Sequence, residues 1–255
     1  MRNDGVLARI GDEMAQAWAI AVKDVRIYYF TPPMIMTGLL LPLFAFFTFS
    51  VKRELGPEAG VARLLAMTTF FTASSAGPVI IPIERQMRTY DRLLAAPVSL
   101  VTILLGKGLV GVFFGVAVSL MSLLIGTLVG RVTIAAPWLL LVGLLLSTAA
   151  FSALGLLFAS APGQTVGSIL MPSVLLRWPL LFISGVFIPL EEMSAWARGL
   201  SYLSPLTYTQ DLMNHAVLGA GAQSLVLDLI VLPLCLVLFL FPALKLHDRS
   251  RKLGL

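Results

Sequence analysis

The sequence carries little charge. Of its 255 residues, 12% are Asp, Glu, Lys or Arg and 58% are hydrophobic, and the mean hydropathy is +0.93. A soluble domain has about twice that charged fraction, so these values exclude an ordinary soluble fold. The net charge of +5 does not indicate nucleic acid, because the cations stand at the ends of apolar runs, where they orient the chain and contact anionic lipid. We expect membrane lipid as a partner and no nucleic acid.

Cysteine and histidine are also scarce. Cys235 is the one cysteine, so an intrachain disulfide and a cysteine metal cluster are both excluded. The two histidines, His215 and His247, fall on opposite sides of the membrane in the topology given below, so they cannot share a site. We therefore expect no metal site.

Nucleotide-binding and hydrolase motifs are missing. The phosphate-loop pattern G-x-x-x-x-G-K-[ST] fails at Gly106-Lys107, because Gly108 follows and Val101 stands where the first glycine belongs. The patterns H-E-x-x-H and G-x-S-x-G are absent as well. The chain should therefore bind no cofactor of its own, ATP included, and it is not expected to be an enzyme.

Six apolar runs approach or exceed the roughly 20 residues with which a helix crosses about 30 Å of hydrocarbon. Several contain proline, which spanning helices tolerate because neighbouring groups satisfy the freed carbonyls. The predicted fold is an all-α polytopic membrane protein with a six-helix domain over residues 31–255, whose spans lie near Pro33–Val51, Leu64–Ile83, Gly108–Val129, Pro137–Ser160, Val166–Ile188 and Leu225–Leu244.

Residues 1–30 predict a separate amphipathic helix. Apolar side chains recur every three or four positions over Val6–Phe30, but the segment is too charged to span a bilayer. It should lie in the membrane interface with Trp18, Tyr28 and Tyr29 at headgroup depth; a soluble helix packed on a partner is the alternative. Met1–Gln16 has no apolar core long enough for a cleavable signal, so we expect the N-terminus to be retained.

Lysine and arginine indicate the orientation. Twelve of the 18 lie in the N-terminal segment, the loop after the second run and the C-terminal tail, whereas five lie in the other loops and Arg177 lies within a run. Cytoplasmic loops are the ones rich in Lys and Arg. Both termini and the loop Ile83–Lys107 are therefore predicted to be cytoplasmic, with the chain in the cytoplasmic membrane.

That loop is the most charged internal segment, and its spacing predicts a short amphipathic helix. Met87, Tyr90 and Leu94 fall three and four residues apart on one face. The segment is either a helix that a membrane domain presents to a soluble partner, or a solvated loop that only follows the charge bias.

Residues around this helix support its limits. Glu84 can pair with Arg88 at i,i+4. Pro97 should end the helix, because the residue before a proline avoids the α region, and Ser99 can cap the next helix. Lys107 is expected to extend its amine to the membrane surface.

Arg177 lies near the middle of the fifth run, where an arginine is costly and should face the protein interior or a hydrated cavity. It is a candidate contact for an anionic substrate or lipid headgroup; the alternative is a structural anchor to backbone carbonyls. Asp, Glu and His are missing from the depth of the predicted spans, since Asp228 is near the outer end of the last one. A proton-coupled secondary carrier is therefore disfavoured.

The segment Pro189–Ser224 is too long for a tight connection and too apolar for a free loop, and Pro205 breaks it. Two short re-entrant helices that dip into the outer leaflet would satisfy its backbone if they are buried in protein. A helical cap outside the membrane is the alternative.

Three segments carry family motifs. Glu84–Ser99 read E-R-x-x-x-T-x-D-x-L-L-x-x-P-V-S, Ser184–Leu190 read S-G-x-x-x-P-L, and Ser204–Tyr208 read S-P-L-T-Y. With the six spans and the N-terminal helix, they resemble the ABC-2 family, the membrane subunits of type V ABC exporters such as daunorubicin-resistance and nodulation-factor permeases.

The resemblance implies a division of labour. A separate ATPase, in two copies, would bind ATP and Mg, and a second permease subunit, identical or paralogous, would complete the transporter. The re-entrant helices, Pro189–Leu218, would form an external gate with Gly185, Pro189, Pro205 and Tyr208. Glu84–Ala96 would be the coupling helix that docks on the ATPase, with the coupling residues Glu84, Arg85, Arg88, Thr89, Asp91, Arg92, Leu93 and Leu94.

The expected function is that of the permease subunit of an ATP-driven exporter. Apolar, proline-broken spans with few Tyr or Trp residues suit an amphipathic or lipid-like substrate such as a drug, lipid or glycolipid. A polysaccharide or glycoconjugate exporter and a non-transporting membrane scaffold are the alternatives.

Overall fold

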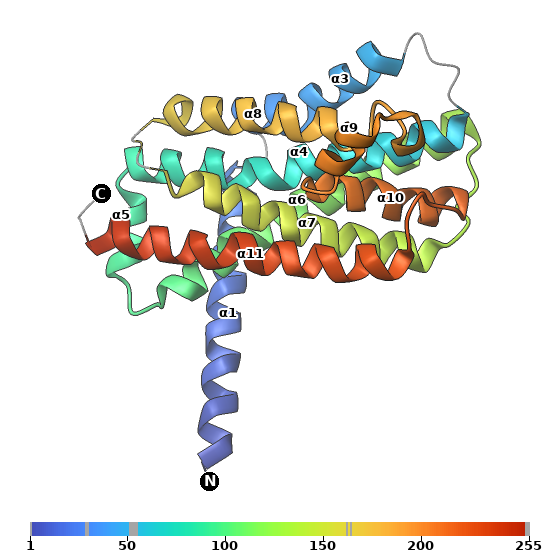
Figure 1. The fold of residues 1–255 in the computed structure, drawn as a ribbon. Helices are drawn as coiled ribbons and strands as arrows, with labels where there is room; N and C mark the ends of the chain where they lie inside the picture. The colour runs from blue at the N-terminus through green and yellow to red at the C-terminus, as the bar shows by residue number, and fades with distance from the viewer. Residues whose placement is uncertain (1, 29–30, 51–55, 162, 164, 253–255) are drawn as a thin grey trace.

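The computed structural model describes residues 2–28, 31–50, 56–161, 163 and 165–252, and the regular elements in these ranges are helices. Figure 1 shows the long helices side by side in one bundle. In chain order the elements are α1 (Arg2–Tyr28), α2 (Pro32–Ile35), the π-helix η1 (Met36–Leu40), α3 (Leu41–Ser50), α4 (Pro57–Gln86), α5 (Thr89–Ala95), α6 (Leu100–Gly130), α7 (Pro137–Ala159), α8 (Val166–Ile183), the 3-10 helix η2 (Leu190–Glu192), α9 (Ala195–Ser201), α10 (Pro205–Leu218) and α11 (Leu225–Lys252).

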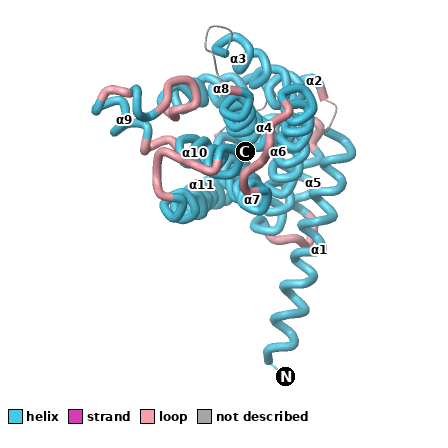
Figure 2. The backbone as a smooth tube through the Cα atoms, turned by 90° about the vertical axis from the view of Figure 1, so that its right-hand side faces the viewer, coloured by secondary structure: helices cyan, strands magenta, loops and turns pink. Residues whose placement is uncertain are grey.

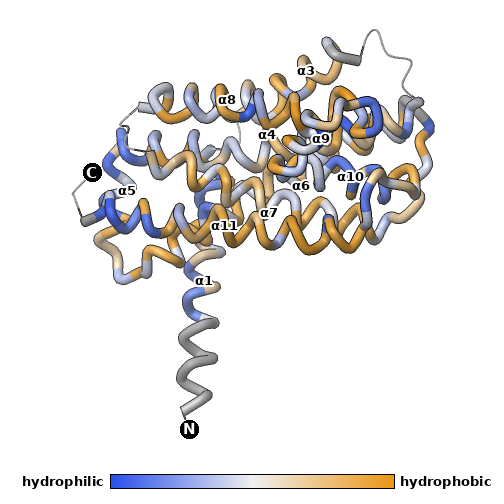
Figure 3. The backbone as a smooth tube through the Cα atoms, in the orientation of Figure 1, coloured by the Kyte–Doolittle hydropathy of each residue, from blue (hydrophilic) through white to orange (hydrophobic). Residues whose placement is uncertain are grey.

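The bundle has two ends that differ in their short helices. The α5 end holds α5 and the last turns of α11, and the α10 end holds α9, α10 and the first turns of α4, α7 and α11 (Figure 1). Hydrophilic residues gather at both ends, and the helices between them are mostly apolar (Figure 3). This is the pattern of a membrane domain whose two ends are exposed to water.

Five described helices are long and apolar enough to cross a bilayer: α4, α6, α7, α8 and α11. They correspond to the second to sixth predicted runs, which confirms the prediction of an all-α polytopic membrane protein. The first predicted run, Pro33–Val51, is divided among α2, η1 and α3, and Val51 lies outside the described residues. It contributes a sixth span only if Pro32–Thr48 is joined to Gly11–Tyr28 across a bend of 93°.

The π-helical break η1 stands just before Pro42. Because a proline has no N–H, Pro42 cannot donate to the Gly38 carbonyl four residues earlier. Thr72 Oγ1 of α4 donates to that oxygen instead, at 2.5 Å. A neighbouring helix thus satisfies the carbonyl that the proline leaves free, as spanning helices require.

The central helix of the bundle is α4, whose side chains are buried without interruption from Leu64 to Pro82. Small residues let its neighbours approach closely, as in other membrane helix pairs. A Cβ on Gly77 would lie 2.6 Å from the Gly155 carbonyl oxygen of α7, and one on Gly111 of α6 would lie 2.7 Å from the Ala73 carbonyl oxygen of α4. The packing therefore joins α4, α6 and α7 into one core.

The first helix, α1, runs across the long axis of the bundle and packs on α6 near the α5 end (Figures 1 and 2). Ala17, Ile20 and Asp24 are buried, whereas the side chains of Met14 and Trp18 are 69% and 63% exposed. A helix perpendicular to the spans with an exposed apolar edge has the arrangement that we expect of an interfacial helix.

The three aromatic residues expected at headgroup depth differ in their surroundings: Trp18 is exposed, and Tyr28 is buried in protein. Tyr28 is only 4% exposed and packs in a cluster with Met34, Val79 and Ile80, so α4 and not lipid surrounds it, and its depth in the membrane stays a prediction. Tyr29 lies outside the described residues.

Candidate functional sites at the two ends of the bundle

The predicted single helix Glu84–Ala96 is two helices. The long helix α4 continues through Glu84 and Arg85 to Gln86, and the backbone of Arg88 is left-handed with φ 54°. An α-helix cannot pass through a left-handed residue, so α5 is restricted to Thr89–Ala95. The single helix was therefore a wrong prediction, and the motif straddles the junction between a span and a short helix.

The other predicted limits of this segment are confirmed. Ala96, the residue before Pro97, is extended with ψ 155°, so α5 ends at Ala95. Ser99 Oγ accepts a hydrogen bond from the Thr102 N–H at 3.0 Å and caps α6. Both results follow from local chemistry, the proline ring in the first case and the hydroxyl acceptor in the second.

One face of α5 is open to solvent. The side chains of Arg88, Thr89, Asp91 and Arg92 are exposed, and those of Leu93 and Leu94 are partly buried against the core at the α5 end. A protein that docks on α5 could contact these six of the eight predicted coupling residues. Glu84 and Arg85 are not equivalent to them, because both belong to α4.

Glu84 belongs to an ion cluster in which the side chains of Glu84, Asp24 and Lys107 are buried and that of Lys23 is 42% exposed. Its carboxylate accepts from Lys107 Nζ of α6 and, at 2.7 Å, from Lys23 Nζ of α1, and Lys107 Nζ also lies 3.2 Å from Asp24 Oδ2. The predictions that Glu84 pairs with Arg88 and that Lys107 reaches the membrane surface are thus wrong. The reason is the same for both: α1 places its own two charges between α4 and α6.

The cluster is electrically balanced, with Lys23 and Lys107 against Asp24 and Glu84. Burial raises the pKa of Asp24, and Lys107 opposes that shift. Burial alone would lower the pKa of Lys23, but its contacts with Asp24 and Glu84 outweigh burial and raise it. The four side chains connect α1, α4 and α6, and we call them the ion cluster. Sequence reasoning did not find Lys23 and Asp24, because nothing local marks a pairing across more than 60 residues.

Tyr90 connects α5 to this cluster. Its ring is 4% exposed, and both Arg85 and Lys107 lie 5.7 Å from the ring centroid. Burial raises the pKa of Tyr90 to about 12, so the phenol stays neutral. Arg85 also donates to the carbonyl oxygens of Ala161 and Gly163 at 3.4 Å. A displacement of α5 would therefore act directly on α4, α6 and the connection between α7 and α8.

Arg177 of α8 has the contacts of a structural anchor. Its side chain is fully buried and donates to the Ser74 carbonyl oxygen at 2.5 Å and to Ser75 Oγ at 3.0 Å. Pro78 lacks the N–H that would otherwise bond the Ser74 carbonyl. Arg177 thus satisfies a carbonyl that a proline in α4 leaves free, and Phe158 covers its guanidinium at 5.6 Å. A contact with substrate stays a prediction.

At the α10 end, α10 descends into the bundle beside α7. Its last turn accepts from the Ala136 N–H at 2.9 Å, and Thr209 donates to Ser147 Oγ at 3.0 Å. Ser147 lies about 15 Å along α7 from Pro137, at about 1.5 Å per residue. Most of α10 is buried against α4, α7 and α11. This burial in protein is the condition that the predicted re-entrant helices had to meet. By contrast, α9 projects from the bundle (Figure 2).

Three of the four predicted gate residues, Gly185, Pro189 and Pro205, lie at a turn or at the start of a helix, and Tyr208 lies within α10. Gly185 has φ +84°, which a residue with a side chain rarely adopts. Pro189 precedes η2, and Pro205 is the first residue of α10. The Tyr208 hydroxyl donates to the Tyr202 carbonyl oxygen at 2.9 Å and fixes α10 to the end of α9. These residues shape the segment; a role in gating stays a prediction.

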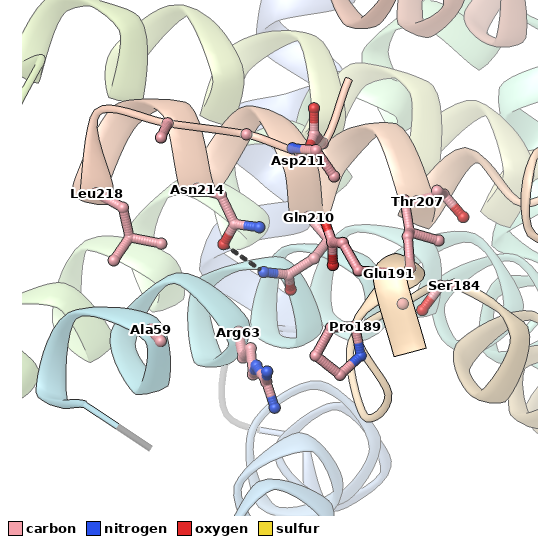
Figure 4. A pocket seen from close by; sticks show the side chains of 15 residues that line it. Ala59, Arg63, Ser184, Pro189, Glu191, Thr207, Gln210, Asp211, Asn214 and Leu218 are labelled. Carbon is pink, nitrogen blue, oxygen red and sulfur yellow. Dashed lines mark hydrogen bonds between the residues drawn. The ribbon is translucent and has the colours of Figure 1, made fainter. Parts of the chain in front are cut away.

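A polar cavity of about 280 Å³ opens at the α10 end. Figure 4 shows Arg63 of α4 and Pro189 on one side, with Gln210 and Asn214 of α10 facing them and hydrogen-bonded to each other at 2.9 Å. Asp211 lies on the same wall. The cavity therefore lies between α4, η2 and α10, and it combines charges of both signs.

The fold defines a multi-pass membrane protein with a short helix at one end that exposes Asp91 and Arg92, and a buried helix inserted at the other. The profile of the ABC-2 type transporter family matches residues 15–218, and the chain belongs to that family. It is 28% identical over 202 residues to nodulation protein J of Neorhizobium galegae, a match that covers 75% of this chain and 74% of that protein. The chain is therefore the membrane subunit of an ABC transporter.

Proposed function

We propose that this chain is the permease of an ATP-driven exporter in the cytoplasmic membrane, with both termini and the α5 end in the cytoplasm. A separate ABC ATPase, which binds ATP and Mg, docks on α5; two copies of each subunit form the transporter. The observation that carries the proposal is the arrangement of α5: Asp91 and Arg92 on it and Arg88 just before it are exposed, and its buried Tyr90 contacts the ion cluster.

This arrangement suits the transfer of motion. When ATP closes the ATPase dimer, the docked α5 moves, and Tyr90 and Arg85 convey the displacement to α4 and α6. The ion cluster keeps α1 in register with both helices, so the three move as one body. The bundle must have two states that differ in contacts for this to drive export, and hydrolysis returns it to the first.

The substrate that fits best is amphipathic or lipid-like. A cavity of about 400 Å³ lies between α1, α6, α7 and α11, nearer the α5 end, and its lining is mainly apolar, with Met14, Leu105 and Leu109 among the residues exposed on its rim. In the proposed orientation it faces the inner leaflet. A hydrophobic molecule could enter from there, whereas a polysaccharide would find few aromatic rings on which to stack.

Docking can be tested with a charge reversal on α5. The tagged chain is purified from its native membrane with the ABC ATPase that co-purifies, and the Kd of that ATPase is then measured on the chain in nanodiscs. We expect Arg92→Glu to raise the Kd at least about tenfold, which corresponds to about 1.4 kcal/mol. Arg249→Glu is the matched control, because Arg249 is an exposed arginine of α11 at the same end of the bundle, and it should leave the Kd unchanged.

Two results would contradict the proposal. If no ABC ATPase co-purifies, the chain is better described as a membrane scaffold. If Arg92→Glu and Arg249→Glu weaken ATPase binding equally, α5 is not the docking site and only the overall charge of this end matters.

A further inference from the structure

Three chelating side chains meet at the α10 end. Asp211 and His215 lie one turn apart on α10, and Asp228 comes from the first turn of α11. One donor atom from each residue lies within 4.8 Å of the other two, and His215 Nε2 is 3.5 Å from Asp211 Oδ2. Two ligands of a tetrahedral Zn²⁺ with bonds of about 2.0–2.1 Å stand about 3.4 Å apart. The spacing is therefore compatible with three ligands of one metal ion.

Asp228 supplies an independent reason to expect a ligand. Its side chain is 0% exposed, and neither carboxylate oxygen accepts a hydrogen bond from an N–H or hydroxyl group among the described residues, so its polar neighbour there is another carboxyl group, that of Asp211. A buried carboxylate without a partner is costly, and it must be neutralised by a proton or a cation. Asp211 faces the same space, so the cluster has two carboxylates and only one imidazole.

The loop between α10 and α11 holds the other two residues in place. The N–H groups of Ala222 and Gln223 donate to Asp211 at 2.6 and 3.1 Å, and the Gln223 carbonyl oxygen lies 3.1 Å from His215 Nε2. A Cβ on Gly221 would lie 2.4 Å from His215 Nε2. The backbone thus closes over the side chains as tightly as a glycine permits, and it orients Asp211 for a ligand.

We propose that Asp211, His215 and Asp228 bind one divalent cation of the Zn²⁺ class, with the Gln223 carbonyl oxygen available as a fourth ligand. Carboxylate and imidazole donors together suit Zn²⁺ better than Mg²⁺, which prefers oxygen ligands. The cation neutralises the buried carboxylates and fixes α10 to α11. Asp211, Gly221 and Ala222 line the polar cavity, which gives the ion a path from solvent. The expectation of no metal site considered cysteines and paired histidines, and this site has neither.

The test uses the full chain in nanodiscs, purified through a tag without histidine, stripped with EDTA and dialysed against Zn²⁺. Elemental analysis should find about one Zn²⁺ per chain. The Tm should rise by about 5 °C at a Zn²⁺ concentration of about one hundred times the Kd, and Mg²⁺ at the same concentration should not raise it. Asp228→Asn and His215→Gln should each weaken Zn²⁺ binding at least tenfold, whereas Glu192→Gln, an exposed carboxylate at the same end, should not.

The proposal is overturned if the wild-type chain retains well under one Zn²⁺, or if Asp228→Asn and Glu192→Gln bind it equally. It is also overturned if Asp228→Asn changes the Tm equally with and without Zn²⁺, because that result means that Zn²⁺ does not neutralise the buried carboxylate. If His215→Gln does not fold, Asp228→Asn alone decides, since an amide keeps the shape of the carboxylate. These outcomes do not depend on whether α5 binds an ATPase.

Discussion

The two ends of the bundle treat buried charge in opposite ways. At the α5 end, the ion cluster has two cations and two anions and is complete within the chain. At the α10 end, Asp211 and Asp228 face a single imidazole, and no N–H or hydroxyl group among the described residues donates to the Asp228 oxygens. A balanced cluster can serve as a rigid connection between helices, whereas an acidic one must take a cation or a proton from outside.

This difference indicates which contacts the chain can maintain alone. Asp24, Glu84 and Lys107 are buried and paired within the chain, and the partly exposed Lys23 completes the balance of charge. We therefore expect α1, α4 and α6 to stay joined whichever state the transporter occupies. The junction of α10 and α11 should instead respond to the medium. The α5 end is thus suited to carry force from a partner, and the α10 end is suited to be stabilised or released by an ion.

The largest expected effect comes from unbalancing the ion cluster. Lys107→Met leaves Asp24 and Glu84 buried with only Lys23, and removing one partner from a buried ion pair costs about 3–5 kcal/mol. For a chain of this size, we expect the Tm to fall by about 10 °C. The double variant Lys107→Met/Glu84→Gln restores the balance of charge, so it should be more stable than the single variant.

The Tm of both variants is measured by thermal unfolding in nanodiscs, followed with a fluorescence signal that does not depend on thiols. Lys245→Met is the matched control, because Lys245 is an exposed lysine at the same end and should change the Tm little. If the double variant is less stable than Lys107→Met, the two residues do not compensate each other, and the balanced-cluster account of the α5 end is wrong.

A smaller effect is expected at the α10 end from Gly221→Ala. The new Cβ would lie 2.4 Å from His215 Nε2 and 2.8 Å from Asp211 Oδ2, so the loop must move and destabilise the chain by about 1–3 kcal/mol. Gly199→Ala is the control, because nothing lies within 4 Å of a Cβ there and alanine favours the helix α9. Equal Tm values for the two variants would show that the loop does not close over His215 and Asp211.

Local sequence signals predicted the parts of the fold that local chemistry decides. Five long apolar runs became spans, Pro97 ended α5, and Ser99 capped α6. The resemblance indicated the regions of α5 and α10. The start of the predicted helix Glu84–Ala96 was too early in the chain, because neither the continuation of α4 past Pro82 nor the left-handed Arg88 has a clear sequence signal.

The unpredicted features depend on contacts between distant segments. Glu84 had a plausible partner in Arg88 within its own helix, and only the position of α1 reveals that Lys23 and Lys107 take that place. Asp228 was noted near the end of a span, but its approach to Asp211 depends on how the loop at Gly221 folds. Arg177 was predicted only in part. The sequence indicated that an arginine in a span needs a partner, but not that the partner is the Ser74 carbonyl, which Pro78 leaves without a hydrogen bond.

The most direct test of the central claim is the side of the membrane on which each end lies. Arg92→Cys and Glu192→Cys, each in a Cys235→Ser background, place single thiols on the exposed surface of the α5 end and the α10 end. A membrane-impermeant maleimide should label Glu192→Cys in intact cells, and Arg92→Cys only in inside-out vesicles. Labelling of Arg92→Cys in intact cells would put α5 outside, where no ATPase could reach it.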